Sequence, residues 1–161
     1  MTSATGSDAG EAGFTLLELI AVVFIIALVL GISYPSMSRG SSALHLRTAS
    51  RDLVNTFRFA REKAVSEQES LQLVIDRKGR KVVLADVLGT PLRTYTLPED
   101  VRIKEMSRAG VEVGEDAMTV RFLPSGGLES AGIRLEADGG SMMQVVADPL
   151  SGGARMEPVY E

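Results

Sequence analysis

Residues 13–35 read GFTLLELIAVVFIIALVLGISYP, and this stretch decides how the rest of the chain is interpreted. From Phe14 to Tyr34, a helix that rises about 1.5 Å per residue would cross the roughly 30 Å hydrocarbon core of a bilayer. Residues 19–30 are apolar without interruption, whereas a helix on the surface of a globular domain would carry a polar stripe. The sequence therefore predicts a transmembrane helix over residues 14–34.

A cleaved secretory signal is the alternative explanation of this stretch. Such a signal begins with basic residues and ends at a small-residue cleavage site. The first residues, MTSATGSDAGEAG, contain no Lys or Arg, and the apolar run ends in Tyr34 and Pro35. All 17 Lys and Arg of the chain lie at or after Arg39. The pattern thus favours an anchor that stays in the protein.

Glu18 is the one charged residue within the apolar stretch. A carboxylate at the centre of a bilayer costs about 2.5–3.5 kcal/mol, and less near the interface. Glu18 either lies at the membrane edge and reaches the headgroups, or it has a partner or a function. The residues alone leave both explanations open.

The string from Gly13 to Glu18, GFTLLE, followed by an unbroken apolar run, resembles the processing site of type IV prepilins and type II secretion pseudopilins. The resemblance implies that residues 1–13 are a leader, that a prepilin peptidase cleaves after Gly13, and that Phe14 is N-methylated. Glu18 would then pair with the new amine on Phe14 of a neighbouring subunit and so promote assembly. Two such charges about 4 Å apart attract by roughly 4 kcal/mol at an effective dielectric of 20, which offsets the insertion cost.

The resemblance also implies a location and an orientation. The helix would lie in the inner membrane, with the N-terminus in the cytoplasm and the C-terminal domain in the periplasm. Members of this family usually carry Lys or Arg before the glycine, but this leader has neither. By the positive-inside rule alone, Arg39, Arg47 and Arg51 would reverse the orientation. We keep the family orientation, because the leader must reach the peptidase on the cytoplasmic side.

Residues 35–68 are predicted to form an amphipathic helical stalk. Pro35 lacks an amide hydrogen, is expected to kink the helix, and falls where many pilin helices carry a proline. The basic residues lie mostly off the apolar stripe, which favours a solvated face over a contact with lipid or nucleic acid. His45 is expected at the surface or in packing rather than as a ligand. The stripe recurs at steps of three and four residues: Leu46, Ala49, Leu53, Phe57, Ala60 and Ala64.

Residues 69–161 are predicted to form a periplasmic β domain, because the hydrophobic period changes from 3.6 to 2. Alternation on successive short segments predicts antiparallel sheets with one buried face, and the fold class is α+β. Residues 77–79, Arg-Lys-Gly, are predicted as the turn of the first hairpin. The candidate strands are residues 70–76, 80–86, 101–106, 118–123, 132–137 and 142–147.

Three segments of this region resemble the GspH/FimT family in family order. They are FRFAREKAVSEQESLQLVID at residues 57–76, FLPSGG at 122–127 and VADPLSG at 146–152. The resemblance implies a pilin-like fold in which a long N-terminal helix packs on a β domain of two antiparallel sheets. It identifies the chain as similar to the minor pseudopilins of type II secretion.

The sequence shows no catalytic constellation. The chain has no Cys and a single His, so thiolate chemistry and multi-histidine metal sites are excluded, and no phosphate-binding loop motif occurs. Gly126–Gly127, Gly139–Gly140 and Gly152–Gly153 are therefore predicted to be turn glycines. We expect no enzymatic activity, no cofactor and no metal.

The resemblance makes the chain a structural subunit at or near the tip of the type II secretion pseudopilus. The expected partners are other pseudopilins, major and minor, the prepilin peptidase, inner membrane lipid and secreted protein substrate. The alternative is a FimT-like minor pilin of a type IV pilus that binds DNA. DNA binding is disfavoured, because the last residues, SGGARMEPVYE, hold one Arg against two Glu. A membrane-tethered enzyme or ligand-binding domain is a third reading, which leaves Glu18 unexplained.

Overall fold

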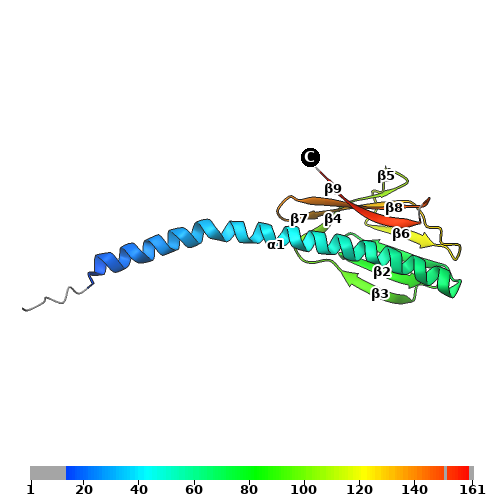
Figure 1. The fold of residues 1–161 in the computed structure, drawn as a ribbon, viewed down its shortest axis with the longest axis horizontal. Coiled ribbons are helices and arrows are strands. Elements are labelled where there is room, and N and C mark those ends of the chain that lie inside the picture. The colour runs from blue at the N-terminus through cyan, green and yellow to red at the C-terminus, as the bar shows by residue number, and fades with distance from the viewer. Residues whose placement is uncertain (1–13, 151, 160–161) are drawn as a thin grey trace, which may run out of the picture. The chain divides into compact units, whose positions relative to one another are not determined.

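A computed structural model describes residues 14–150 and 152–159, without the side chains of residues 31–40. Within these ranges the chain forms one helix, α1 (Leu16–Glu67), followed by nine strands (Figure 1). The described residues divide into two compact units, the first ending at Met37 and the second beginning at Ser38. The strands are β1 (Leu71–Asp76), β2 (Lys81–Asp86), β3 (Pro91–Thr96), β4 (Val101–Arg108), β5 (Val111–Glu112), β6 (Ala117–Phe122), β7 (Ala131–Ala137), β8 (Met142–Asp148) and β9 (Gly153–Val159).

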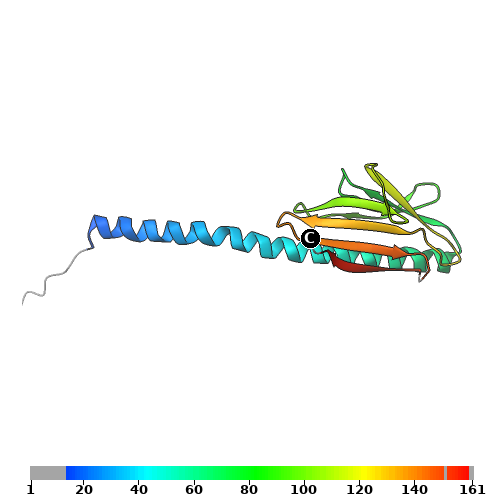
Figure 2. The same ribbon diagram turned by 90° about the horizontal axis from the view of Figure 1, so that it is seen from above.

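The strands form two antiparallel sheets in the second unit. The four-stranded sheet has the order β3-β2-β1-β6, and the five-stranded sheet has the order β5-β4-β7-β8-β9. Figure 2 shows β9 running alongside the C-terminal half of α1. This arrangement confirms the predicted α+β class and the predicted packing of a helix on two antiparallel sheets.

The core of the second unit lies between α1 and the two sheets. All six apolar positions predicted for the helical stripe, from Leu46 to Ala64, are buried. Phe57 of α1 meets Phe122 of β6 with their ring centroids 5.6 Å apart and their planes at 61°, an edge-to-face contact. The hydroxyls that share this side of the helix are satisfied locally, since Ser50 Oγ donates to the Leu46 carbonyl at 2.8 Å. The amphipathic pattern therefore places the helix as predicted.

The six predicted strands all form, within a few residues of the predicted bounds. β1 and β2 pair in register from Leu71 opposite Asp86 to Asp76 opposite Lys81, so the predicted hairpin is confirmed. Alternate residues of β1, Leu71, Leu73 and Ile75, are buried.

Three strands were not predicted: β3, β5 and β9. β3 begins at Pro91, a residue that is tolerated at the first position of an edge strand. No strand was predicted after residue 147, but Gly153–Val159 pair with β8 along their whole length. All three strands lie at sheet edges, where only one side is paired and the burial pattern is weak.

Candidate assembly site

The N-terminal end of α1 is a capped helix start. Thr15 precedes the first helical residue, and its Oγ1 accepts a hydrogen bond from the Glu18 backbone N–H at 3.3 Å. Thr at the cap with Glu three residues later is the spacing of a capping box, in which the acidic side chain bonds back to the cap N–H. Only the threonine half of that box forms among the described residues, and a capping role for Thr15 was not predicted.

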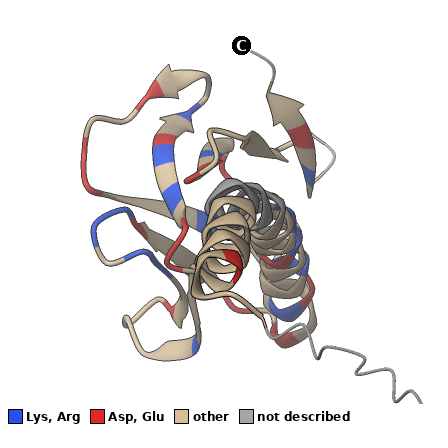
Figure 3. Ribbon diagram, turned by 90° about the vertical axis from the view of Figure 1, so that its left-hand side faces the viewer, with Lys and Arg blue, Asp and Glu red and all other residues tan. Residues whose placement is uncertain are grey.

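The Glu18 carboxylate has no hydrogen bond or ion pair with any described residue, and its side chain is exposed. Every side chain from Phe14 to Leu30 is exposed as well, and apart from Glu18 all of them are uncharged. Figure 3 accordingly shows no basic residue on the N-terminal turns of α1. An apolar surface of this extent is typical of a segment that contacts lipid or other subunits. Glu18 is the one acid placed on it.

The other predicted site residues are described only in part. Gly13 lies outside the described residues, so the cleavage site has no structural counterpart here. The backbone of Pro35 belongs to α1, but its side chain is not described, and the kink stays a prediction. Within the described residues, no helix combines the length and the apolar character that crossing a membrane requires. The predicted span of residues 14–34 extends into the stretch whose side chains are not described.

Arg61 fixes the C-terminal half of α1 to two turns of the β domain. Its Nε donates to the Gly126 carbonyl at 2.9 Å. Gly152 lies so close that a Cβ there would be 2.7 Å from Arg61 Nε, and both glycines have positive φ, 83° and 63°. A larger residue would be strained at either position, and at Gly152 it would also displace the guanidinium. The basic residues of the stalk were expected on a solvated face, which is wrong for Arg61, because this arginine is partly buried and bonds to the Gly126 carbonyl beside Gly152.

These two turns are the ends of the segments at residues 122–127 and 146–152 that carry the GspH/FimT resemblance. Their shared contact with Arg61 gives the sequence pattern a physical meaning. Gly126 and Gly152 lie where the two turns contact Arg61 of the helix. Turn glycines were correctly predicted at both positions.

A second polar contact joins α1 to the start of β4. His45 Nδ1 lies 2.9 Å from Asp100 Oδ2, and the His45 side chain is exposed, which agrees with its predicted place at the surface. Burial raises the pKa of Asp100, but hydrogen bonds from His45 and Ser42 outweigh it and leave the pKa below its ordinary value. On the β3 side, burial and the nearby Asp52 carboxylate raise the pKa of Tyr95 to about 12. These contacts hold the helix on the domain and offer no reactive group.

Among the residues that the structure describes, no group of three or more His, Asp or Glu side chains could hold a metal ion. The polar side chains of this part of the chain mostly meet in exposed pairs, such as Lys78 with Asp116 at 2.6 Å. Exposed pairs of this kind contribute little and are not a chemical site. The feature that calls for a function is the exposed apolar helix with its single acid.

Family profiles match both halves of the chain. The prokaryotic N-terminal methylation motif matches residues 8–34, and the type II transport protein GspH family matches residues 49–151. No curated protein sequence matches the chain. The two matches follow each other along the chain and together cover most of it.

Solved structures of pilus-like subunits share the fold. The minor pseudopilin EpsH from the type II secretion system of Vibrio cholerae is 15% identical, with a TM-score of 0.58 over 73% of this chain and 99% of that one. The type IV minor pilin FimU of Pseudomonas aeruginosa is 17% identical, with a TM-score of 0.53 over 70% of this chain and 88% of that one. At such identities, the likeness shows the fold alone.

The family assignment rests on the profile that covers more than half of the chain. It agrees with the turns that contact Arg61, and the methylation motif at residues 8–34 contains the capped, apolar start of α1. The family is structural rather than catalytic, and its members interact with other pseudopilins and are processed by prepilin peptidase. The chain belongs to the GspH family of type II transport proteins, the minor pseudopilins of type II secretion.

Proposed function

We propose that the protein is a structural subunit at or near the tip of the type II secretion pseudopilus, where it serves protein export across the outer membrane. The helix of residues 14–34 anchors it in the inner membrane, with the N-terminus cytoplasmic and residues 69–161 in the periplasm. The stalk of residues 35–68 joins the two parts. It acts without enzymatic activity and without a cofactor.

The observation that carries this proposal is the position of Glu18. Its carboxylate has no partner among the described residues, although it stands on an exposed helix that is otherwise apolar. After cleavage behind Gly13, the chain would begin at Phe14, one helical turn before Glu18. The methylated amine of Phe14 on an adjacent pseudopilin would then neutralise Glu18, and both charges would leave water only as a pair.

The protein needs several partners for this role. The peptidase removes the leader, lipid surrounds the helix, and the major and minor pseudopilins supply the neighbouring helices. A secreted protein substrate is a further partner at the tip. The family supports the pseudopilins and the peptidase as partners, and the exposed apolar surface of residues 14–30 supports contacts with lipid and with neighbouring helices.

The likeness to the fold of FimU supports the type IV pilus alternative, but the C-terminal region holds few of the basic residues that DNA binding would use. DNA binding near the C-terminus would need unpaired basic groups. Arg155 is the only basic residue after residue 150, and its Nε lies 2.7 Å from Glu157 Oε1. The C-terminal strand therefore favours the secretion role over a DNA-binding role.

An in-frame deletion of the gene tests the proposal. We expect exported proteins to fall at least about tenfold in the culture medium and to accumulate in the periplasm, because a tip subunit is needed to begin the filament. A plasmid copy of the wild-type gene should restore export. Normal export combined with a loss of type IV pili or of DNA uptake would instead establish the pilus alternative.

A further inference from the structure

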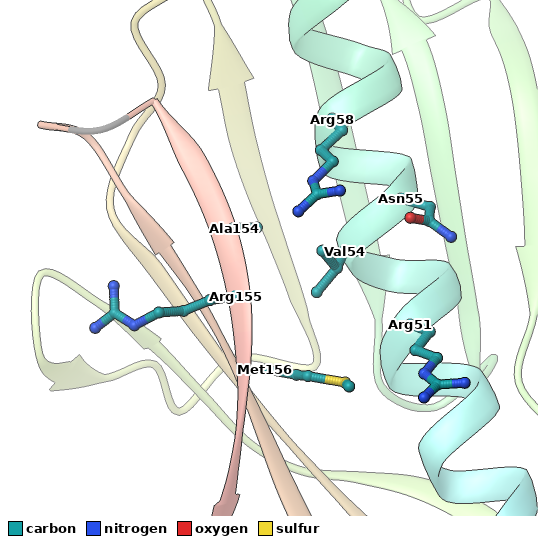
Figure 4. A pocket seen from close by; sticks show the side chains of 7 residues that line it. All are labelled: Arg51, Val54, Asn55, Arg58, Ala154, Arg155 and Met156. Atoms are coloured by element: carbon teal, nitrogen blue, oxygen red, sulfur yellow. The ribbon is translucent and has the colours of Figure 1, made fainter.

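A groove runs between α1 and the outer edge of β9 (Figure 4). It consists of two adjoining hollows of about 340 and 450 Å³, which share Met156 in their lining. Arg47, Arg51 and Arg58 line it from the helix, and Ala154, Met156 and Pro158 line it from the strand. We call these six residues the arginine groove. All of them belong to the second unit of the chain.

The groove carries positive charge that the chain itself does not neutralise. Neither hollow is lined by an acidic residue. Arg47, Arg51 and Arg58 are exposed, and none has a hydrogen bond or ion pair with a described residue. Arg155 differs, because Figure 4 shows it pointing away from α1, and it pairs with Glu157. The three helix arginines, spaced by four and seven residues, lie along one side of the helix and line the two hollows.

The edge of β9 offers free backbone groups to the same groove. β9 pairs only with β8 among the described strands, and Pro158 lies opposite Met143. Pro158 has no amide hydrogen, so it must occupy a position whose backbone faces away from β8. Ala154 and Met156 share that phase of the strand. Their N–H and C=O groups therefore point away from β8 and have no partner among the described residues.

We propose that the arginine groove binds an extended acidic segment of another protein, which adds a strand to the free edge of β9. The added strand would pair its backbone with Ala154 and Met156, while its carboxylates would meet the arginines of α1. The spacing suits such a ligand. Arg47 and Arg51 are about 6 Å apart along the helix axis, and alternate residues of a strand are about 6.6 Å apart.

A protein segment explains the groove better than a nucleic acid does. Phosphates would satisfy the arginines but not the row of backbone donors and acceptors on β9. An extended acidic peptide satisfies both at once. The proposal goes beyond the assembly role, because it concerns the second unit of the chain and does not depend on the pairing of Glu18.

The test uses the full chain in nonionic detergent micelles and a fluorescent peptide of alternating glutamate and valine, as long as β9. Fluorescence anisotropy should report saturable binding that weakens with salt. Reversing two charges with Arg51→Glu and Arg58→Glu should weaken binding at least about tenfold, which is about 1.4 kcal/mol. N-methylation of alternate peptide amides should weaken it to a similar extent, because strand pairing is lost.

The control variant is Arg121→Glu, which reverses another exposed arginine, on β6 in the other sheet. It changes the net charge per substitution by the same amount and should leave binding within about twofold. Circular dichroism should confirm that the variants keep their β content, since the substituted side chains are exposed. A peptide of alternating lysine and valine should not bind.

Four results would overturn the proposal. They are no binding at about 1 mM peptide, equal binding by the N-methylated peptide, equal binding by the doubly reversed variant, and tighter binding of a DNA oligonucleotide than of the peptide. Glu18→Ala should leave peptide binding unchanged, so a failure of the assembly role and a failure of this proposal can be told apart.

Discussion

Glu18→Ala should yield a chain that is cleaved, methylated and inserted normally but enters filaments at least about tenfold less often than wild type. The change removes the carboxylate that the account pairs with the amine of Phe14 on a neighbour, an attraction of roughly 4 kcal/mol at about 4 Å and an effective dielectric of 20. Because alanine costs nothing in lipid, membrane insertion should not suffer. The measurement is the fraction of the mature protein in sheared pseudopili against that in the membrane.

Two further variants separate charge pairing from helix capping. Glu18→Gln keeps the shape and the capacity for a capping box but removes the charge, so it should assemble as poorly as Glu18→Ala. Thr15→Ala removes the Oγ1 that accepts from the Glu18 N–H, which should cost about 1 kcal/mol in the first turn and leave assembly largely intact. Normal assembly of Glu18→Gln would mean that Glu18 acts as a capping residue and that the pairing is wrong.

Phe57→Ala should destabilise the second unit by about 3–5 kcal/mol, a large part of the 5–15 kcal/mol that holds an ordinary domain together. Phe57 is 1% exposed and contacts Phe122 edge to face, so truncation would leave a cavity between α1 and β6. The urea midpoint of the full chain in nonionic micelles, followed by circular dichroism, should fall accordingly.

Phe59→Ala is the matched control, two residues away on the same helix. Phe59 is 40% exposed, and its ring lies 5.7 Å from the Arg93 guanidinium carbon. Loss of that contact should cost about 1 kcal/mol or less. If the two variants unfolded at the same urea concentration, α1 would not pack on the sheets as described.

The central strands and the second half of α1 could be predicted because each has one solvent-exposed face and one buried face. Phe57 and its neighbours recur at helical spacing, and β1 alternates with period 2, so burial leaves a clear mark on the sequence. Strand β3 shows no such alternation, because five of its six residues are exposed. β9 contains Pro158, Arg155 and Glu157, residues that are uncommon in the interior of a sheet. It was missed because an edge strand pairs on one side only and need not alternate clearly between buried and exposed residues.

Only part of the candidate site could be predicted from the sequence. The motif from Gly13 to Glu18 could be recognised from residue types alone, because a charge within an apolar run is rare. The role of Arg61 could not, since its partners, Gly126 and Gly152, lie far along the chain and one of them offers only a backbone carbonyl. The arginine groove could not be predicted either, because its second side is formed by β9, a strand that was not predicted.

The N-terminal residue of the native protein tests the account most directly. Intact-mass and fragment-ion mass spectrometry of the chain purified from its own membranes should show a sequence that begins at Phe14 and carries one added methyl group. Cleavage behind Gly13 supplies the amine to which Glu18 is assigned, so the assembly mechanism requires it. A chain that still began with the thirteen leader residues, unmethylated at Phe14, would contradict the account.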